Sequence, residues 1–265
     1  MERKKRPELP KESGKKMGVQ SRLQDLVRVS SLIFTGTVLE LGKSSVPAVP
    51  ANESLVVVRL DRSLRVDPVL GDVRGKMVTL VPRSPGTLHV GQRAVFFTNS
   101  WIHGRGIAVR EVEHMDVQEE DQVVAAVDQL PQVHLNDRLK SAELVVDAEV
   151  ARISPVEQRS SERNVALWAG AELRVKRVLH GAATKTTRVY FPTADWPPWT
   201  NAPRFTERQR GIFILHTPGR DRTLSEATLD AGSLVALDLA DFQPESELHS
   251  IEEMLATIAA EGGIR

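Results

Sequence analysis

Two matching stretches decide the fold: SSLIFTGTVLEL at residues 30–41 and AELVVDAEVARI at residues 142–153, which align without a gap. In both, apolar or small residues recur at every second position and so share one face of an extended chain. These positions are Leu32, Phe34, Gly36 and Val38 in the first stretch and Leu144, Val146, Ala148 and Val150 in the second. Such alternation is typical of a half-buried strand in an antiparallel sheet. The opposite face, with Thr35 and Thr37 in the first stretch, is predicted to be exposed.

Further matches extend outward from these strands in the same order, with length changes only between them. They are VVRLDRSL (57–64) with ELRVKRVL (172–179), MVTLVP (77–82) with TRVYFP (187–192), GQRAVFFT (91–98) with RQRGIFIL (208–215) and, more loosely, IAVREVEH (107–114) with VALDLADF (235–242). Helical spacing of apolar residues precedes the first strand and follows the last one in both copies. Repeated segments in a fixed order indicate one module written twice.

Each copy is thus predicted to contain a short N-terminal helix, about five strands and a closing C-terminal helix. Five strands joined by turn-rich connections favour a small closed or nearly closed barrel, because closure leaves no exposed strand edge. The predicted organisation is a basic disordered arm over residues 1–18, a first β-barrel over residues 19–131 and a second over residues 132–265. The fold class is therefore mostly β, as two tandem barrels.

A known family shares this order of strands. The residues that carry the similarity are Gly36-Thr37-Val38, Val58 to Leu64 and Gly91 to Phe97, with their counterparts in the second copy. The pattern resembles bacterial modules related to the netrin and metalloproteinase-inhibitor group, whose members are OB-like five-stranded barrels. The resemblance implies two tandem OB-like barrels that bind other proteins. The animal inhibitors of that group act through an N-terminal Cys, and this chain contains no Cys, so inhibition of that kind is not expected.

Composition sets limits on chemistry and location. Among the 265 residues 41% are hydrophobic, 26% are charged and none is Cys, which excludes disulfides, thiolate catalysis and Cys-based zinc sites. No stretch approaches the roughly 20 apolar residues of a membrane-spanning helix, so no membrane insertion is expected. No apolar signal-peptide core follows the basic N-terminus. We expect a soluble cytoplasmic protein; an exported one whose sequence lacks its native start would read the same way.

No pattern of catalytic, metal-binding or cofactor-binding residues is found in the sequence. The seven His residues form no H-E-x-x-H motif, and neither a G-x-S-x-G nor a phosphate-binding glycine loop occurs. His114 and His216 close predicted strands, where a lone His is usually an ordinary surface residue. The chain is therefore predicted to be non-enzymatic, with no metal and no cofactor.

Tryptophans mark the candidate contact residues. Trp196 and Trp199 lie in TADWPPWTNAPRF (193–205), a proline-stiffened connection whose counterpart in the first copy has no aromatic residue. These indoles either anchor a partner, as Trp commonly does at interfaces, or fold back as a structural plug. Trp101, with His103 and Arg105, follows the fourth strand of the first copy and either contacts a partner or caps its barrel.

Charge is uneven along the chain. Residues 1–16 carry seven basic and three acidic side chains, a net of +4, which leaves −4 on the remainder. The arm, with Arg3, Lys4, Lys5 and Arg6, is either a solvated tail or a tether to an acidic protein, nucleic acid or membrane surface. The favoured function is a protein-interaction or scaffold module that makes contacts through its inter-strand loops. The alternative is a nucleic-acid-binding tandem OB-fold protein. That reading rests on basic residues of the predicted strands, namely Arg59, Arg62, Arg174, Lys176, Arg177 and Arg188.

Overall fold

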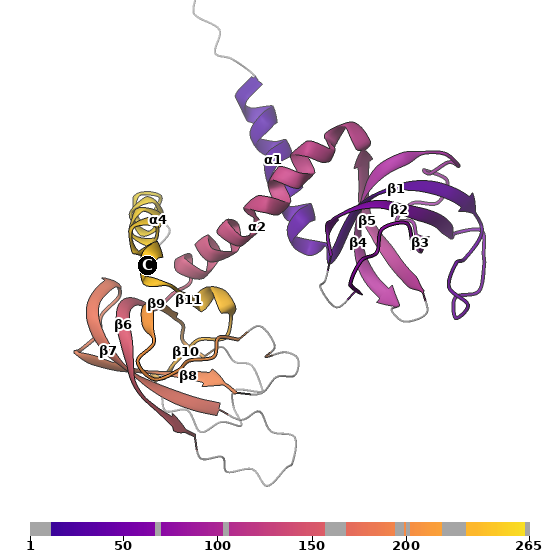
Figure 1. Ribbon diagram of the computed structural model, residues 1–265. Coiled ribbons are helices and arrows are strands. Elements are labelled where there is room, and N and C mark those ends of the chain that lie inside the picture. Colours follow the sequence, from indigo (N-terminus) through magenta and orange to yellow (C-terminus); the bar gives the residue numbers. More distant parts are fainter. Residues whose placement is uncertain are drawn as a thin grey trace, which may run out of the picture. The chain divides into compact units, whose positions relative to one another are not determined.

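The computed structural model describes residues 12–66, 70–102, 106–156, 168–193, 199, 202–218 and 232–262 (Figure 1). The chain divides into two compact units, Met1–Pro131 and Gln132–Arg265, and both are mostly β. Within the described ranges no helix has the length and apolar character needed to cross a membrane.

The first unit contains a closed five-stranded barrel with the strand order β1-β2-β3-β5-β4. Its strands are β1 (Leu32–Leu41), β2 (Val56–Arg65), β3 (Met77–Val81), β4 (Arg93–Ile102) and β5 (Ile107–Asp116). Only the β3–β5 pair is parallel among these strands. Leu32, Phe34 and Val38 lie in the barrel core, which confirms the predicted inward face of the first strand.

The outer face of β1 and β4 is also covered, so the expectation of half-buried strands is wrong at this place. Helix α1 (Glu12–Val29) and the N-terminal part of α2 (Glu120–Lys140) pack against it. This second cluster includes Leu26, Val27, Ile33, Val95, Phe97 and Val123. Thr35, expected to be exposed, is fully buried and donates a hydrogen bond to Glu120 Oε2 at 2.8 Å.

Helix α1 begins at Glu12, which corrects the prediction of a disordered arm as far as residue 18. Leu23, Leu26 and Val27 anchor the helix in the outer cluster of the first unit. Starting a helix is costly and adding turns to an existing one is cheap. An anchored helix therefore extends back through residues 12–18 although these residues show no apolar periodicity.

The second unit has a curled six-stranded sheet, a half-barrel, in place of the expected closed or nearly closed five-stranded barrel. The sheet order is β10-β8-β7-β6-β9-β11. The strands are β6 (Leu144–Pro155), β7 (Trp168–His180), β8 (Thr186–Pro192), β9 (Arg210–Leu215), β10 (Leu234–Val235) and β11 (Phe242–Gln243). The C-terminal part of α2 and helix α4 (Leu248–Ala260) cover its outer face. A single helix, α2, thus supplies both the closing helix expected for the first copy and the opening helix expected for the second.

An insertion accompanies the difference between the two sheets. In the first unit β5 pairs with both β3 and β4. In the second unit β10 pairs with β8 and is joined by an isolated bridge, Val235 to His216, to the residue after β9, whereas β11 pairs with β9. On the third strand, Leu80 pairs with Val109 in the first unit, and its counterpart Tyr190 pairs with Val235 in the second. On the fourth strand, Phe96 pairs with His114 in the first unit, and its counterpart Phe213 pairs with Phe242 in the second. The closing segment of the second unit therefore carries two additional residues. They are accommodated by a 3-10 helix, Leu239–Asp241, that separates β10 from β11.

Candidate functional site

The hairpin of β4 and β5 extends beyond the end of β1. The last pair between β1 and β4 joins Leu32 to Thr98, but β4 continues to Ile102 along β5. The register shifts between Ser100 and Ile102, so Trp101 is the bulged residue. Bulges bend a strand and redirect a side chain. Trp101 is 44% exposed.

Arg110 on β5 covers one face of this indole, with its guanidinium carbon 5.1 Å from the ring centroid. Such cation–π contacts stabilise an exposed pair by about 0.5–1 kcal/mol. Ala108, two residues earlier on the same strand face, is buried beneath Val46 and Val49. Trp101 and Arg110 form what we term the Trp101–Arg110 platform, which rests on a packed part of the sheet.

Ser31, at the junction of α1 and β1, fixes the base of the hairpin. Its backbone N–H donates to Asn99 Oδ1 at 3.0 Å, and its hydroxyl accepts from the Ser100 N–H at 3.0 Å. The Thr98 hydroxyl donates to the Leu32 carbonyl at 2.8 Å. The strand that carries the indole is therefore held to β1 immediately before the bulge.

Of the other predicted contact residues, Trp199 is described by the structure, and it is buried. Trp199 is only 5% exposed and packs edge-to-face on Trp168, with ring centroids 5.4 Å apart. Tyr190 and Val235 complete this cluster. Trp199 therefore lacks the exposure that an anchor requires, and the plug alternative describes it. Trp196, His103, Arg105 and the arm residues Arg3, Lys4, Lys5 and Arg6 lie outside the described residues.

The basic side chains considered for nucleic-acid binding are engaged within their own units. Five of them face carboxylates: Arg59 with Asp61, Arg62 with Glu120, Arg174 with Glu149, Lys176 with Asp147 and Glu245, and Arg177 with Glu252. Arg188 stacks on Tyr190 at 5.2 Å and donates to the Ser154 hydroxyl. These cations are largely neutralised locally, which reduces their attraction for phosphate.

The inserted 3-10 helix of the second unit carries a buried carboxylate that sequence reasoning missed. Arg138 on α2 binds Asp241 in a bidentate manner, with both N···O distances 2.7 Å. His216 Nε2 lies 3.2 Å from Asp241 Oδ1, and the Leu237 and Asp238 N–H groups donate to Oδ2. We call Arg138, His216 and Asp241 the Asp241 cluster. Asp241 itself is fully buried.

This arrangement is structural in character. Burial alone would raise the pKa of Asp241, but hydrogen bonds from His216 and Arg138 hold that pKa below its usual value. His216 Nδ1 lies 3.1 Å from the Ser141 carbonyl, so both ring nitrogens face protein acceptors. In sequence, only the Asp pair in VALDLADF hinted at this insertion.

A second buried carboxylate lies in the first unit. His114 Nδ1 is 2.5 Å from Glu111 Oε1, and the Arg83 N–H donates to Glu111 Oε2 at 2.8 Å. The bond to Glu111 raises the pKa of His114 although partial burial opposes this. The expectation that His114 and His216 are ordinary surface residues is therefore wrong for both: each pairs with a buried carboxylate.

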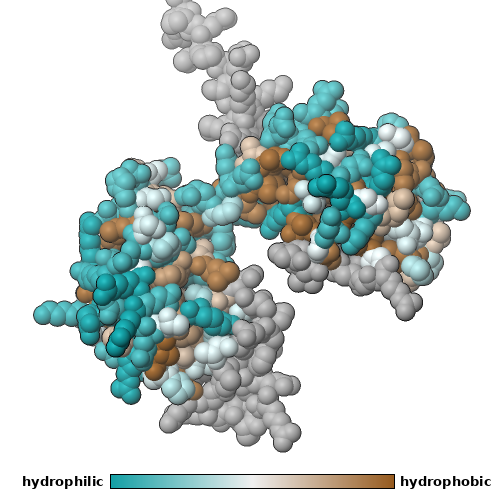
Figure 2. Space-filling view, in the orientation of Figure 1, coloured by the Kyte–Doolittle hydropathy of each residue, from teal (hydrophilic) through white to brown (hydrophobic). Residues whose placement is uncertain are grey.

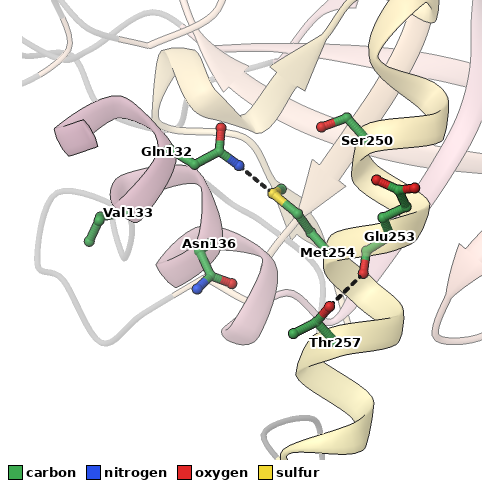
Figure 3. A pocket seen from close by; sticks show the side chains of 7 residues that line it. All are labelled: Gln132, Val133, Asn136, Ser250, Glu253, Met254 and Thr257. Atoms are coloured by element: carbon green, nitrogen blue, oxygen red, sulfur yellow. Dashed lines mark hydrogen bonds between the residues drawn. The ribbon is translucent and has the colours of Figure 1, made fainter. Parts of the chain in front are cut away.

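A hollow of 370 Å³ lies between α2 and α4 of the second unit (Figure 3). It is lined by Gln132, Val133, Asn136, Ser250, Glu253, Met254 and Thr257. The Gln132 amide bonds across it to the Met254 sulfur. Glu253 is its only ionisable lining residue. No group of His, Cys, Asp or Glu that could hold a metal ion occurs in the parts of the chain that the structure describes.

Exposed apolar residues are dispersed, and Figure 2 shows hydrophobic residues interspersed with hydrophilic ones on the visible face. The large exposed ones among the described residues are Val29, Leu41, Met77, Val90, Trp101, Val178 and Leu239. Trp101 is the aromatic member of this set. Comparison with known proteins gives no relative to set beside these features: no protein-family model and no curated protein matches the chain.

Proposed function

We propose that the chain is a non-catalytic protein-interaction module built from a duplicated OB-like β-unit, with its contact where the end of β4 pairs with the start of β5. The exposed Trp101–Arg110 platform carries this proposal. Trp and Arg are the residues most enriched among those that dominate binding energy at protein interfaces. Here they lie together on the neighbouring strands β4 and β5, where β4 continues along β5 past its last pair with β1.

Two features support the duplicated OB-like origin. The matched segments form consecutive strands in each unit, and both units enclose an inner apolar cluster and an outer one under two helical segments. The described residues of the two units also differ at the end of the fourth strand. There the first unit continues into Trp101, and the second turns inward with His216. A feature present in one copy only is not required by the shared fold, which favours a functional origin for the hairpin.

The nucleic-acid alternative has weaker support. Single strands are bound by a continuous basic groove with several stacking aromatics. The strand arginines instead form ion pairs with neighbouring acids, and Arg188 already occupies one face of Tyr190. A non-catalytic role fits the Asp241 cluster and the His114–Glu111 pair, because their polar atoms bond to one another within the protein.

Affinity enrichment from the native host tests the proposal. The bait is the full chain, compared with Trp101→Ala and with Leu239→Ala as a control, since Leu239 is also an exposed apolar residue. We expect at least one protein to bind the wild type and the control and to be lost with Trp101→Ala. An identical set of bound proteins for all three baits would refute the role of the hairpin.

A further inference from the structure

We infer that the Trp101–Arg110 platform binds an acidic peptide segment in which a carboxylate lies next to an apolar side chain. This inference rests on the proposed function and specifies the class of partner. The carboxylate would pair with Arg110, and the apolar side chain would pack on the exposed part of Trp101.

The geometry of Arg110 leaves its hydrogen-bonding edge for a ligand. A guanidinium carries its five N–H donors in its own plane, and the guanidinium carbon of Arg110 lies over the Trp101 ring, 5.1 Å from its centroid. Among the described residues, none accepts a hydrogen bond from these donors. Paired N–H groups in one plane match the two oxygens of a carboxylate, so a bidentate contact is the natural complement.

The ion pairs of the first unit also indicate that Arg110 binds an anionic ligand. Arg59, Arg62 and Arg93 in the same unit each lie within ion-pair distance of a carboxylate. Across the part of the chain that the structure describes, no carboxylate forms an ion pair with Arg110, and this side chain is exposed. A cation that no described residue of its unit neutralises, placed on an aromatic ring, favours an anionic ligand with an apolar part.

The Trp101–Arg110 platform is also preorganised for binding. The bonds of Ser31 to Asn99 and Ser100 hold β4 just before the bulge. Ala108, on the strand of Arg110, is buried. Holding contact residues on a rigid element reduces the entropy lost when a partner binds.

A peptide fits this site better than a nucleic acid does. A single strand needs several unpaired cations along its phosphates, whereas the strand arginines Arg59 and Arg62 of the first unit have acidic partners. One cation beside one indole matches the spacing of one acidic and one apolar side chain. Binding of a single strand is therefore the competing outcome in the experiment.

Selection from a displayed library of random twelve-residue peptides tests the inference on the full chain. We expect enrichment of peptides with Asp or Glu beside Leu, Ile, Phe or Trp. Affinity of the best synthetic peptide, measured by fluorescence polarisation, should fall about tenfold or more with Trp101→Ala and with Arg110→Gln. Arg74→Gln, which removes another exposed arginine of the first unit, should leave it unchanged. Replacing the acidic residue of the peptide by its amide should abolish the difference between wild type and Arg110→Gln.

The outcomes separate this inference from the proposed function. Failure to enrich any peptide, enrichment without acidic residues, or equal loss with Arg74→Gln and Arg110→Gln overturns the inference. Tighter binding of a twelve-nucleotide oligo(dT) than of the peptide, lost with Trp101→Ala, overturns it in favour of nucleic acid. If the peptide experiment fails but affinity enrichment still yields a protein that depends on Trp101, the proposed function stands and only the partner class is wrong.

Discussion

Replacing Arg138 by Leu should strongly destabilise the second unit. The change removes two charged hydrogen bonds of 2.7 Å from a fully buried carboxylate. Asp241 would keep only His216 and two backbone N–H groups, and removing one partner of a buried ion pair typically costs about 3–5 kcal/mol. Leu is a suitable replacement because Leu26 takes the matching place in the first copy, so a loss cannot be ascribed to an unsuitable shape for the helix.

Urea unfolding followed by tryptophan fluorescence measures this loss. Trp168 and Trp199 are both buried in the second unit and report its transition. With a slope of about 1–3 kcal/mol per molar urea, the midpoint should fall by about 1–5 M. The control is Arg177→Leu, whose pair with Glu252 is 59% and 32% exposed and should contribute under about 1 kcal/mol. A midpoint for Arg138→Leu no lower than that of the control would refute the reasoning.

Acidification offers an independent check on the same cluster. The pKa of Asp241 is lowered in the folded state by its bonds to His216 and Arg138, which outweigh burial. Its contribution to stability is therefore complete above the ordinary carboxyl pKa, about 3.9, and is lost as the pH falls through the lower folded value. The wild-type second unit should lose this stability in acid, and Asp241→Asn should lack that component. If the stability of the two proteins fell equally with decreasing pH, the lowered pKa of Asp241 in the folded state would be contradicted.

Three further changes test the packing and the remaining titratable pair. Thr35→Val should cost the first unit about 1–3 kcal/mol in urea unfolding, because the Glu120 carboxylate loses a buried donor; no loss would mean that this strand face is solvated. Glu111 raises the pKa of His114, so stability from this pair is complete below the unfolded value of about 6.5 and declines as the pH rises through the folded one. Thermal unfolding measured from about pH 6 to about pH 9 should show this decline in the wild type and not in His114→Gln. Trp199→Ala should destabilise the second unit by about 3–5 kcal/mol, and an unchanged midpoint would place that indole at the surface.

The period of two in residues 30–41 was enough to predict the strand and its inward face, since Phe34 and Val38 lie in the barrel core. The same pattern could not reveal that Thr35 is buried, because a Thr that bonds to a distant Glu120 is indistinguishable in sequence from one that faces water. Burial of the outer face depends on helices that return from elsewhere in the chain. Tertiary packing therefore overrides the local pattern here.

The second unit departs further from expectation because a short insertion changes strand pairing without changing local apolar periodicity. When VALDLADF is aligned with IAVREVEH of the first copy, Phe242 pairs in the sheet as its aligned residue His114 does. Val235 instead pairs as Val109 does, two places after its aligned residue Ile107. The buried role of Asp241 depends on Arg138 and His216, which are far from it in sequence. For the platform, sequence singled out Trp101 but gave no sign of Arg110, since the pair meets only through a bulge.

Site-specific photo-cross-linking in the native host tests the central claim most directly. A photoreactive benzoylphenylalanine replaces Trp101 in one version of the chain and Val90, which is 59% exposed in the same unit, in another. We predict a covalent adduct with another protein at position 101, its decrease when Arg110→Gln is added, and no adduct at position 90. Absence of a protein adduct at position 101, or equal adducts at both positions, would contradict the account.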